Sequence, residues 1–241
     1  DDVDASDGNK PLAPSVYFMR LAQRIVSAIS APTGEGKLYE IDLRLRPSGN
    51  KGPIAARLGG YFDYLKDSAW TWEFMALTRA RPISGPTELQ AQISDGIHDL
   101  LTMPRDANKL ICEVDHMRSR MAGEHYGESI WDIKHHRGGL VDIEIIAQNF
   151  QLSLGPDDPT VLSPTTMEAL RKLSTANALS YNDAHVLMSA LKLWQGLQSI
   201  IRLIGPERLE DGQPPAGQAN ALCHVAEVET FDVLRLLVEE K

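Results

Sequence analysis

The stretch LYEIDLRLRPSG, residues 38–49, determines how the first part of this chain is interpreted. Four of its charged side chains are separated from one another by single apolar residues: Glu40, Asp42, Arg44 and Arg46. Side chains of a β-strand point alternately to its two faces, so this alternation predicts a strand with one face on a core and the other on charged groups. A turn at residues 47–49 is expected to end the strand.

The charged face of this predicted strand carries groups suited to an anionic ligand held through a divalent cation. Asp42, with Glu40 on the same face, offers the hard oxygen ligands that Mg²⁺ takes, one or two at a time, together with substrate phosphates. Arg44 and Arg46 offer planar cations that match phosphate oxygens. The stretch therefore predicts parts of a phosphoryl- or nucleotidyl-transfer site, with Asp42 as its catalytic residue. The alternative is a strand at a sheet edge whose charges pair with one another in water.

The segments after the strand add further candidates for nucleotide binding. Ser48 supplies a hydroxyl, Gly49 an open backbone, and Lys51 a cation on a flexible stem that a triphosphate would attract. For Lys51 the alternative is a loop lysine in water. Arg79 and Arg81 flank Ala80 in a short run that we expect to be extended, which would place both on one face as the basic rim of a cleft. For these two the alternative is a pair of surface arginines.

Several longer motifs accompany this stretch. They are YEIDLRLRPSG at 39–49, AWTWE at 69–73, LTRAR at 77–81, WDIK at 131–134 and RGGLVDIE at 137–144. In content and order they closely resemble the glutamine synthetase adenylyltransferase family, and they span most of the chain. Long ordered motifs of this kind are far more specific than a single short pattern.

The resemblance implies a function and a set of partners. Members of the family are large bacterial enzymes with two related nucleotidyltransferase domains, one attaching AMP to glutamine synthetase and the other removing it by phosphorolysis. The Arg-Pro-Ser-Gly and Trp-Thr-Trp-Glu segments resemble the C-terminal, adenylylating half. That half implies ATP, Mg²⁺, a tyrosine of glutamine synthetase and the PII signal protein, in the regulation of nitrogen assimilation. Two alternatives stay open: the adenylyl-removing half, or a non-catalytic module that docks glutamine synthetase or PII.

The resemblance also implies a polymerase-β-like palm in which a Gly-Ser pair precedes an Asp-x-Asp on an earlier strand. The spacing of Asp2, Val3 and Asp4 fits Asp-x-Asp, but these residues lie in a polar, turn-rich terminus and are interpreted as a surface loop. We therefore expect a palm that is incomplete at its N-terminus, with Asp42 as the third carboxylate of the site. Two-metal displacement requires several carboxylates, and one aspartate cannot supply them alone.

The apolar periodicity predicts an α+β chain with an all-α helical bundle at 87–241, and the resemblance implies that residues 1–86 are a partial nucleotidyltransferase palm. The expected helices are 15–30, capped by Ser15 and packed on the sheet; about 58–65; two between 87 and 121, separated by Pro104; and 139–154, 165–173, 182–204 and 229–240, the last two capped by Asn182 and Thr230. Residues 207–218, rich in Pro and Gly, are expected to form a mobile loop. Four side chains are predicted to be buried behind the strand: Trp70, Trp72, Phe74 and Met75.

A second polar cluster is expected at the start of the helix at 139–154. Lys134 and Arg137 precede two glycines, and the helix then bears Asp142 and Glu144. A basic loop at a helix N-terminus can bind an anion through the free N–H groups, whereas the two carboxylates lie too far apart around the helix to chelate one ion easily. The alternative is that these cations pair with the carboxylates and fix a domain interface. The neighbouring His135 and His136 lack a third metal ligand at useful spacing and are expected at the surface.

Composition restricts the function further. The chain has 24 Lys and Arg against 33 Asp and Glu, a net charge of −9, which argues against binding to nucleic acid or to an anionic membrane. Its two cysteines, Cys112 and Cys223, have no metal-type spacing and predict a reducing cytoplasm. The sequence contains no apolar run of the roughly 20 residues that a membrane span needs, so we expect a soluble, cytoplasmic protein.

Overall fold

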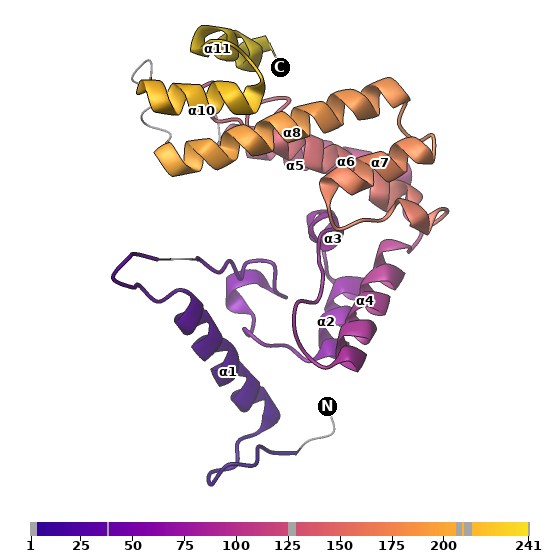
Figure 1. The fold of residues 1–241 in the computed structure, drawn as a ribbon. Coiled ribbons are helices and arrows are strands. Elements are labelled where there is room, and N and C mark those ends of the chain that lie inside the picture. The colour runs from indigo at the N-terminus through magenta and orange to yellow at the C-terminus, as the bar shows by residue number, and fades with distance from the viewer. Residues whose placement is uncertain (1–3, 38, 125–128, 206–208, 210–213, 241) are drawn as a thin grey trace. The chain divides into compact units, whose positions relative to one another are not determined.

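A computed structural model describes residues 4–37, 39–124, 129–205, 209 and 214–240, and these residues are mostly helical (Figure 1). They group into two compact units: the first contains residues 1–74 and 82–100, and the second contains 75–81 and 101–241. The α4 helix (Thr87–Leu101) thus groups with the first unit, and the short segment 75–81 groups with the second. The predicted domains 1–86 and 87–241 stay a prediction.

The predicted strand at 38–49 is wrong for the residues that the structure describes. Residues 39–43 form neither helix nor strand, and turns follow from residue 44 into the 3₁₀-helix η1 (Gly49–Lys51). The only β-bridge in the described residues joins Thr33 to Gly36 within a tight turn. A strand needs a neighbouring strand to satisfy its N–H and C=O groups, and the described residues provide none. The helical part of the predicted fold class is confirmed, but the palm is not.

The first helix, α1 (Pro14–Ile29), agrees with its prediction to within one residue at each end. Its expected cap was wrong, because Ala13 occupies the N-cap position and Pro14 begins the helix. Proline suits this position, since its fixed φ is helical and its missing N–H would have no partner in the helix. No residue of α1 is buried, and its large apolar side chains, including Phe18 and Ile25, are exposed. The sheet on which the helix was expected to pack does not occur in the described residues.

Two further helices of the first unit pack closely against each other. The α2 helix (Leu58–Asp67), as predicted, carries Phe62 and the buried Leu65. A Cβ atom added to Gly96 of α4 would lie 2.2 Å from the Phe62 ring, so glycine permits this close approach of α2 and α4. Figure 1 shows the two helices side by side.

The aromatic segment that was expected to support a strand forms the α3 helix (Thr71–Leu77) instead. Trp70 and Trp72 are 71% and 40% exposed, so their predicted burial was wrong. The helical backbone is the reason, because side chains then share a face every three to four residues. Glu73 and Leu77, four residues apart, are buried, as is Met75.

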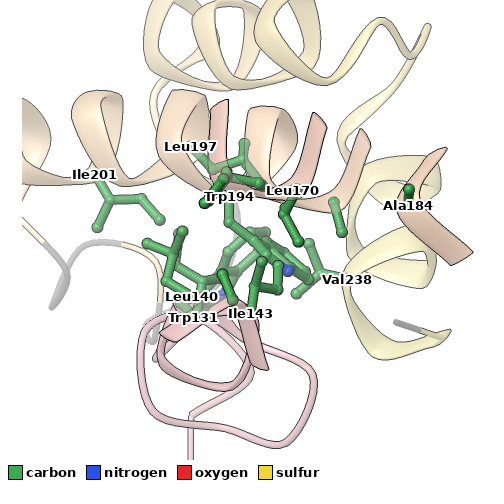
Figure 2. Close-up of a cluster of buried hydrophobic side chains, with 14 of the residues drawn as sticks. Trp131, Leu140, Ile143, Leu170, Ala184, Trp194, Leu197, Ile201 and Val238 are labelled. Atoms are coloured by element: carbon green, nitrogen blue, oxygen red, sulfur yellow. The ribbon is translucent and has the colours of Figure 1, made fainter. Parts of the chain in front are cut away.

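The second unit contains the larger core. Its helices are α5 (Ala107–Glu124), α6 (Leu140–Leu154), α7 (Thr166–Thr175), α8 (Tyr181–Ile204), α10 (Ala216–Ala226) and α11 (Phe231–Glu240), with the 3₁₀-helix η2 (Pro159–Val161). The long α8 packs against α6, α7 and α10, and α10 also packs against α11. Figure 2 shows apolar side chains from these helices converging on Trp194, which is fully buried. This core holds the segments that carry the second polar cluster.

The ends of these helices follow local capping chemistry. Ser180, rather than the predicted Asn182, caps α8, and its hydroxyl accepts a hydrogen bond from the Asp183 N–H at 3.1 Å. The predicted Thr230 cap is confirmed, because its hydroxyl accepts from the Val233 N–H at 3.3 Å. The α10 helix was not predicted. Residues 216–218, which were assigned to a loop, form its first turn, while 207, 208 and 210–213 lie outside the described residues.

Candidate functional site

The charged loop, residues 42–52, is compact although it is not a strand. Ser48 and Gly49 have φ angles of 60° and 53°, so both lie in the left-handed region. The N–H groups of Gly49 and Gly52 donate to the carbonyls of Arg46 (2.9 Å) and Gly49 (3.1 Å). A Cβ atom at Gly52 would lie 1.8 Å from the Pro47 carbonyl oxygen, so only glycine allows the loop to close here. The loop therefore has a defined backbone without the support of a sheet.

Asp42 and Arg44 form an ion pair at the surface of this loop. The Arg44 Nη2 lies 2.6 Å from Oδ2 of Asp42, its Nε lies 3.0 Å from both carboxylate oxygens, and its backbone N–H donates to Oδ1 at 2.9 Å. These hydrogen bonds, led by the one from the guanidinium side chain, lower the pKa of Asp42 to about 2. Both side chains are exposed, so the pair contributes little to the stability of the fold. Its consequence is that Asp42 stays ionised to a lower pH than an isolated aspartate does.

Replacing Arg44 with glutamine is expected to raise the pKa of Asp42 from about 2 toward its ordinary value of 3.8. Because the folded-state pKa is lowered, the pairing acts above the ordinary pKa and is lost as the pH falls through about 2. An NMR titration of the Asp42 carboxyl carbon measures this shift. Arg57→Gln, which removes an exposed cation outside the loop, is the control. An Asp42 pKa that stays near 2 in Arg44→Gln would show that Arg44 is not its cause.

Arg46 holds the loop together from inside. Its Nη1 donates to the Leu43 carbonyl at 2.8 Å and its Nε to the Gly52 carbonyl at 3.1 Å, so it joins the two ends of the loop. The side chain is half-buried. Sequence reasoning placed Arg46 with Arg44 as a nucleotide ligand, but its donors are directed at backbone carbonyls. Of the two arginines, Arg44 is the one on the exposed side.

Lys51 and Ser48 lie on the outside of the same loop, both exposed. The Lys51 N–H donates to the Ser48 carbonyl at 3.2 Å, which fixes the backbone between them. Within the described part of the chain, the Lys51 ammonium forms no ion pair. The loop thus brings together Asp42, Arg44, Ser48 and Lys51 as exposed polar groups on one short segment.

Sequence reasoning missed the hydrogen bonds of a buried carboxylate in the first unit. Glu73 is buried, with 8% of its surface exposed, and its Oε1 accepts a hydrogen bond from the Tyr64 hydroxyl at 2.8 Å. Its Oε2 accepts from the Trp70 N–H at 2.9 Å. A glutamate that reaches back to the N–H of the residue before its helix is half of a capping box, so the spacing of Trp70 and Glu73 was the available signal.

The described residues do not form a magnesium site by themselves. Both carboxylate oxygens of Asp42 accept from Arg44, and Glu40 is paired with Lys37 at 3.2 Å. In the part of the chain that the structure describes, no three His, Cys, Asp or Glu side chains come together to hold a metal ion. Asp42 has the oxygen chemistry that Mg²⁺ prefers, but a lone carboxylate is an incomplete site.

The second polar cluster is built differently from its prediction. Asp142 pairs with the buried Arg118 of α5 and also accepts from the Gly138 N–H at 2.8 Å. Glu144 pairs with Arg79 at 2.7 Å. The alternative interpretation of the sequence paired these two carboxylates with Lys134 and Arg137, whereas their partners in the structure are Arg118 and Arg79. Lys134 and Arg137 are instead exposed and form no ion pair with any described residue.

The N-terminus of α6 has few donors left for an anion. The Leu140 N–H donates to the Ile133 carbonyl at 3.0 Å and the Val141 N–H to the Lys134 carbonyl at 3.1 Å. A helix-terminal anion site needs such N–H groups free. His136, expected at the surface, packs its ring edge-on against Trp194 with the centroids 5.2 Å apart. The contacts of this cluster therefore fix the loop before α6 to the neighbouring helices.

Arg79 and Arg81 both belong to the second unit. Arg79 lies in a turn after α3, which differs from the extended run that was predicted, and its guanidinium is bound to Glu144. Arg81 is exposed. Arg79, one of the two arginines predicted to form the basic rim, is thus engaged in an ion pair within the second unit.

Comparison with known proteins first gives the class. Residues 1–96 match the family model described as glutamate-ammonia ligase adenylyltransferase, and residues 110–211 match the model described as GlnD PII-uridylyltransferase. Both descriptions name nucleotidyl-transfer proteins. No helix in the described residues is long and apolar enough to cross a membrane.

The relatives give the particular family. Proteins named bifunctional glutamine synthetase adenylyltransferase/adenylyl-removing enzyme are 45% identical over 227 residues in Brucella suis, 42% over 231 in Rhizobium meliloti and 39% over 240 in Rhodopseudomonas palustris. These alignments cover 93%, 94% and 100% of this chain. They confirm the family predicted from the motifs: the chain belongs with the glutamine synthetase adenylyltransferases. It spans about a quarter of the length of these relatives, 23–24%.

Proposed function

We propose that this chain is the part of a glutamine synthetase adenylyltransferase that transfers AMP from ATP to a tyrosine of glutamine synthetase. The observation that carries the proposal is the similarity of nearly the whole chain to enzymes with that name. The Arg-Pro-Ser-Gly segment at 46–49 favours the adenylylating half over the removing one. In the proposed reaction the tyrosine hydroxyl attacks the α-phosphate in line and pyrophosphate leaves.

The charged loop supplies the proposed contacts to ATP. Arg44 and Lys51 are exposed cations on one loop, and Ser48 adds a hydroxyl and a backbone that lies open beside Gly49. We propose that Arg44 exchanges its Asp42 partner for a phosphate oxygen when ATP binds, since a guanidinium matches both anions. Arg46 keeps the loop closed through its two carbonyl contacts. Arg81 stays a proposed phosphate contact, and Arg79 would first have to leave Glu144.

The ionisation of Asp42 limits its proposed role. A carboxylate with a pKa of about 2 is a weak proton acceptor at neutral pH, because an effective general base has a pKa near the working pH. Asp42 is therefore proposed to act as a fixed negative charge that positions cations. Mg²⁺ is part of the proposal as the ion that ATP phosphates carry, which takes only one or two protein carboxylates. A cytoplasmic location likewise stays a prediction.

A second candidate, removal of AMP by phosphorolysis, is favoured by the names of the relatives, which include both activities. Regulation through the PII protein is proposed for the second unit, because residues 110–211 match a model described as GlnD PII-uridylyltransferase. A partner-binding role without catalysis would then belong to that unit.

The test is AMP transfer from labelled ATP to glutamine synthetase, measured with the polypeptide that carries this sequence. Asp42→Asn is expected to lower the rate by about 10²-fold, the usual loss when one charge-positioning group is removed. Asp63→Asn, which changes an exposed aspartate of α2, is the matched control and should leave the rate unchanged. A loss confined to phosphate-dependent release of ADP from AMP-labelled glutamine synthetase identifies the removing half. Unchanged rates in both assays for Asp42→Asn would exclude the proposed role.

A further inference from the structure

The guanidinium of Arg46 bridges two backbone positions near the opposite ends of the charged loop. Its Nη1 donates to the Leu43 carbonyl at 2.8 Å, and its Nε donates to the Gly52 carbonyl at 3.1 Å. The Arg46 carbonyl in turn accepts from the Gly49 N–H at 2.9 Å, so the side chain and the backbone of this residue both take part in closing the loop.

The two carbonyls that Arg46 holds belong to the chain neighbours of the two exposed cations. Leu43 precedes Arg44, and Gly52 follows Lys51. A bridge between the two neighbours therefore fixes the separation of the backbone positions from which the two cations extend. A guanidinium suits this task, because it is a planar fork with several N–H donors in a fixed geometry, whereas a lysine ammonium is a compact point charge.

We propose that Arg46 is a positioning residue that holds Arg44 and Lys51 at a fixed spacing, and that this spacing makes the loop select a polyphosphate over a monophosphate. This inference rests on the proposed function of the charged loop and adds the ligand class that the loop distinguishes. A chain of phosphates can bind two cations that extend from separate positions, whereas a single phosphate group engages one of them. Arg46 itself does not touch the nucleotide, because its donors stay on the two carbonyls.

The loop needs such a bridge because its closed backbone is strained. Ser48 has a φ of 60°, a region that residues with a Cβ atom rarely adopt unless surrounding contacts hold them there. Gly52 approaches the Pro47 carbonyl so closely that an added Cβ atom would lie 1.8 Å from the oxygen. In the described residues no sheet supports this segment. The bonds of Arg46 therefore act against a conformation that would otherwise tend to open.

A direct contact between Arg46 and the nucleotide is the competing explanation. Gly52→Ala distinguishes the two, because it opens the loop through the clash with the Pro47 carbonyl and leaves the guanidinium in place. Its matched control is Gly59→Ala on α2, where an added Cβ atom meets nothing within 4 Å. The control for Arg46→Lys is Arg57→Lys, which makes the same exchange at an exposed position outside the loop.

The experiment measures the binding of Mg·ATP and of AMP by calorimetry in the wild type, the two loop variants and the two controls. Arg46→Lys and Gly52→Ala are each expected to bind Mg·ATP about 10-fold more weakly, the size of one lost hydrogen bond to a charged group, and to bind AMP within about 2-fold of the wild type. In a transfer assay both should raise the KM for ATP more than they lower kcat. The controls should match the wild type.

Hydrogen exchange of the Gly49 amide reports the closure of the loop independently of any nucleotide. This N–H donates to the Arg46 carbonyl, and it should exchange about 10-fold faster in both loop variants. Thermal unfolding midpoints equal to that of the wild type show that the helices of each variant are intact. Unchanged exchange of Gly49 in both variants would overturn the inference, because the loop would then stay closed without the bridge.

The binding results separate the inference from the function on which it rests. A wild type that binds no Mg·ATP overturns the proposed function and the inference with it. A wild type that binds Mg·ATP, with ATP and AMP affected equally in both loop variants, overturns the inference alone. A loss of ATP affinity confined to Arg46→Lys identifies a nucleotide ligand, and one confined to Gly52→Ala shows that another group closes the loop. Either result also overturns the inference.

Discussion

Replacing Trp194 with alanine is expected to lower the free energy of unfolding of the second unit by about 3–5 kcal/mol, the usual cost of truncating a buried large aromatic side chain. Trp194 is fully buried on α8, and Figure 2 shows it between Trp131, Leu140 and Leu170. Its Nε1 also donates to the Gly138 carbonyl at 3.0 Å. The substitution therefore leaves a cavity in the core and removes a hydrogen bond to the loop before α6.

Denaturant unfolding followed by circular dichroism measures this loss. Trp194→Phe keeps one aromatic ring and deletes the N–H together with part of the ring volume, so it should cost less than Trp194→Ala. Trp70→Ala is the control: the Trp70 side chain is 71% exposed, and its loss should change the free energy of unfolding by no more than about 0.5 kcal/mol. Equal unfolding midpoints for Trp194→Ala and Trp70→Ala would contradict the placement of Trp194 at the centre of the core.

The helices were the predictable part of this fold. The apolar period of α6 and α8 continues over four or more turns, so their existence did not depend on any long-range contact. Their ends depended on single side chains. Ser180, which precedes the apolar period, caps α8, whereas Asn182 lies inside it. The α10 helix escaped prediction because its first turn, Ala-Gly-Gln-Ala, has little apolar content and follows two prolines.

The strand predicted at 38–49 shows that alternation of apolar and charged residues is not sufficient to predict a strand. The period of two was regular, but alternation describes only how side chains would be distributed if the backbone were extended and paired. In the structure Arg46 turns back to the Leu43 and Gly52 carbonyls, and Gly52 permits the close approach to Pro47. The exposed pair of Asp42 and Arg44 agrees with the alternative interpretation, in which these charges pair with one another in water, although the backbone there is a turn and not a sheet edge.

The polar cluster at the start of α6 shows how the sequence analysis missed a buried charge. Leu110, Val114 and Arg118 recur at intervals of four on α5, and all three are buried. A prediction that follows only the apolar side chains of this helix assigns Met117, and not its neighbour Arg118, to the buried face. It therefore misses the buried charge. The carboxylates Asp142 and Glu144 were identified as polar groups of interest, but their partners come from residues 24 and 65 positions away in sequence, counted as 142 minus 118 and 144 minus 79. Spacing within one segment carries no signal for such pairs.

Replacing Arg118 with methionine is expected to cost about 3–5 kcal/mol, the usual result of removing one partner from a buried ion pair. Arg118 is 6% exposed. Its Nε pairs with Asp142, and its Nη2 donates to the carbonyls of His135 at 2.9 Å and His136 at 3.4 Å. Methionine keeps an unbranched apolar stem and loses every donor. A carboxylate and two carbonyls then have to find other partners, and the loop before α6 loses its tie to α5.

The matched control is Arg120→Met, two residues further along α5, where the arginine is exposed and the expected change is within about 0.5 kcal/mol. Adding Asp142→Asn to Arg118→Met removes the unpaired negative charge while keeping an oxygen that can accept from the Gly138 N–H. The double variant should therefore recover part of the loss, and a double-mutant cycle should give a coupling of about 0.5–3 kcal/mol. Additive losses in that cycle would contradict the pairing of Arg118 with Asp142. A loss in Arg118→Met no larger than in Arg120→Met would show that this buried guanidinium does not hold the second unit together.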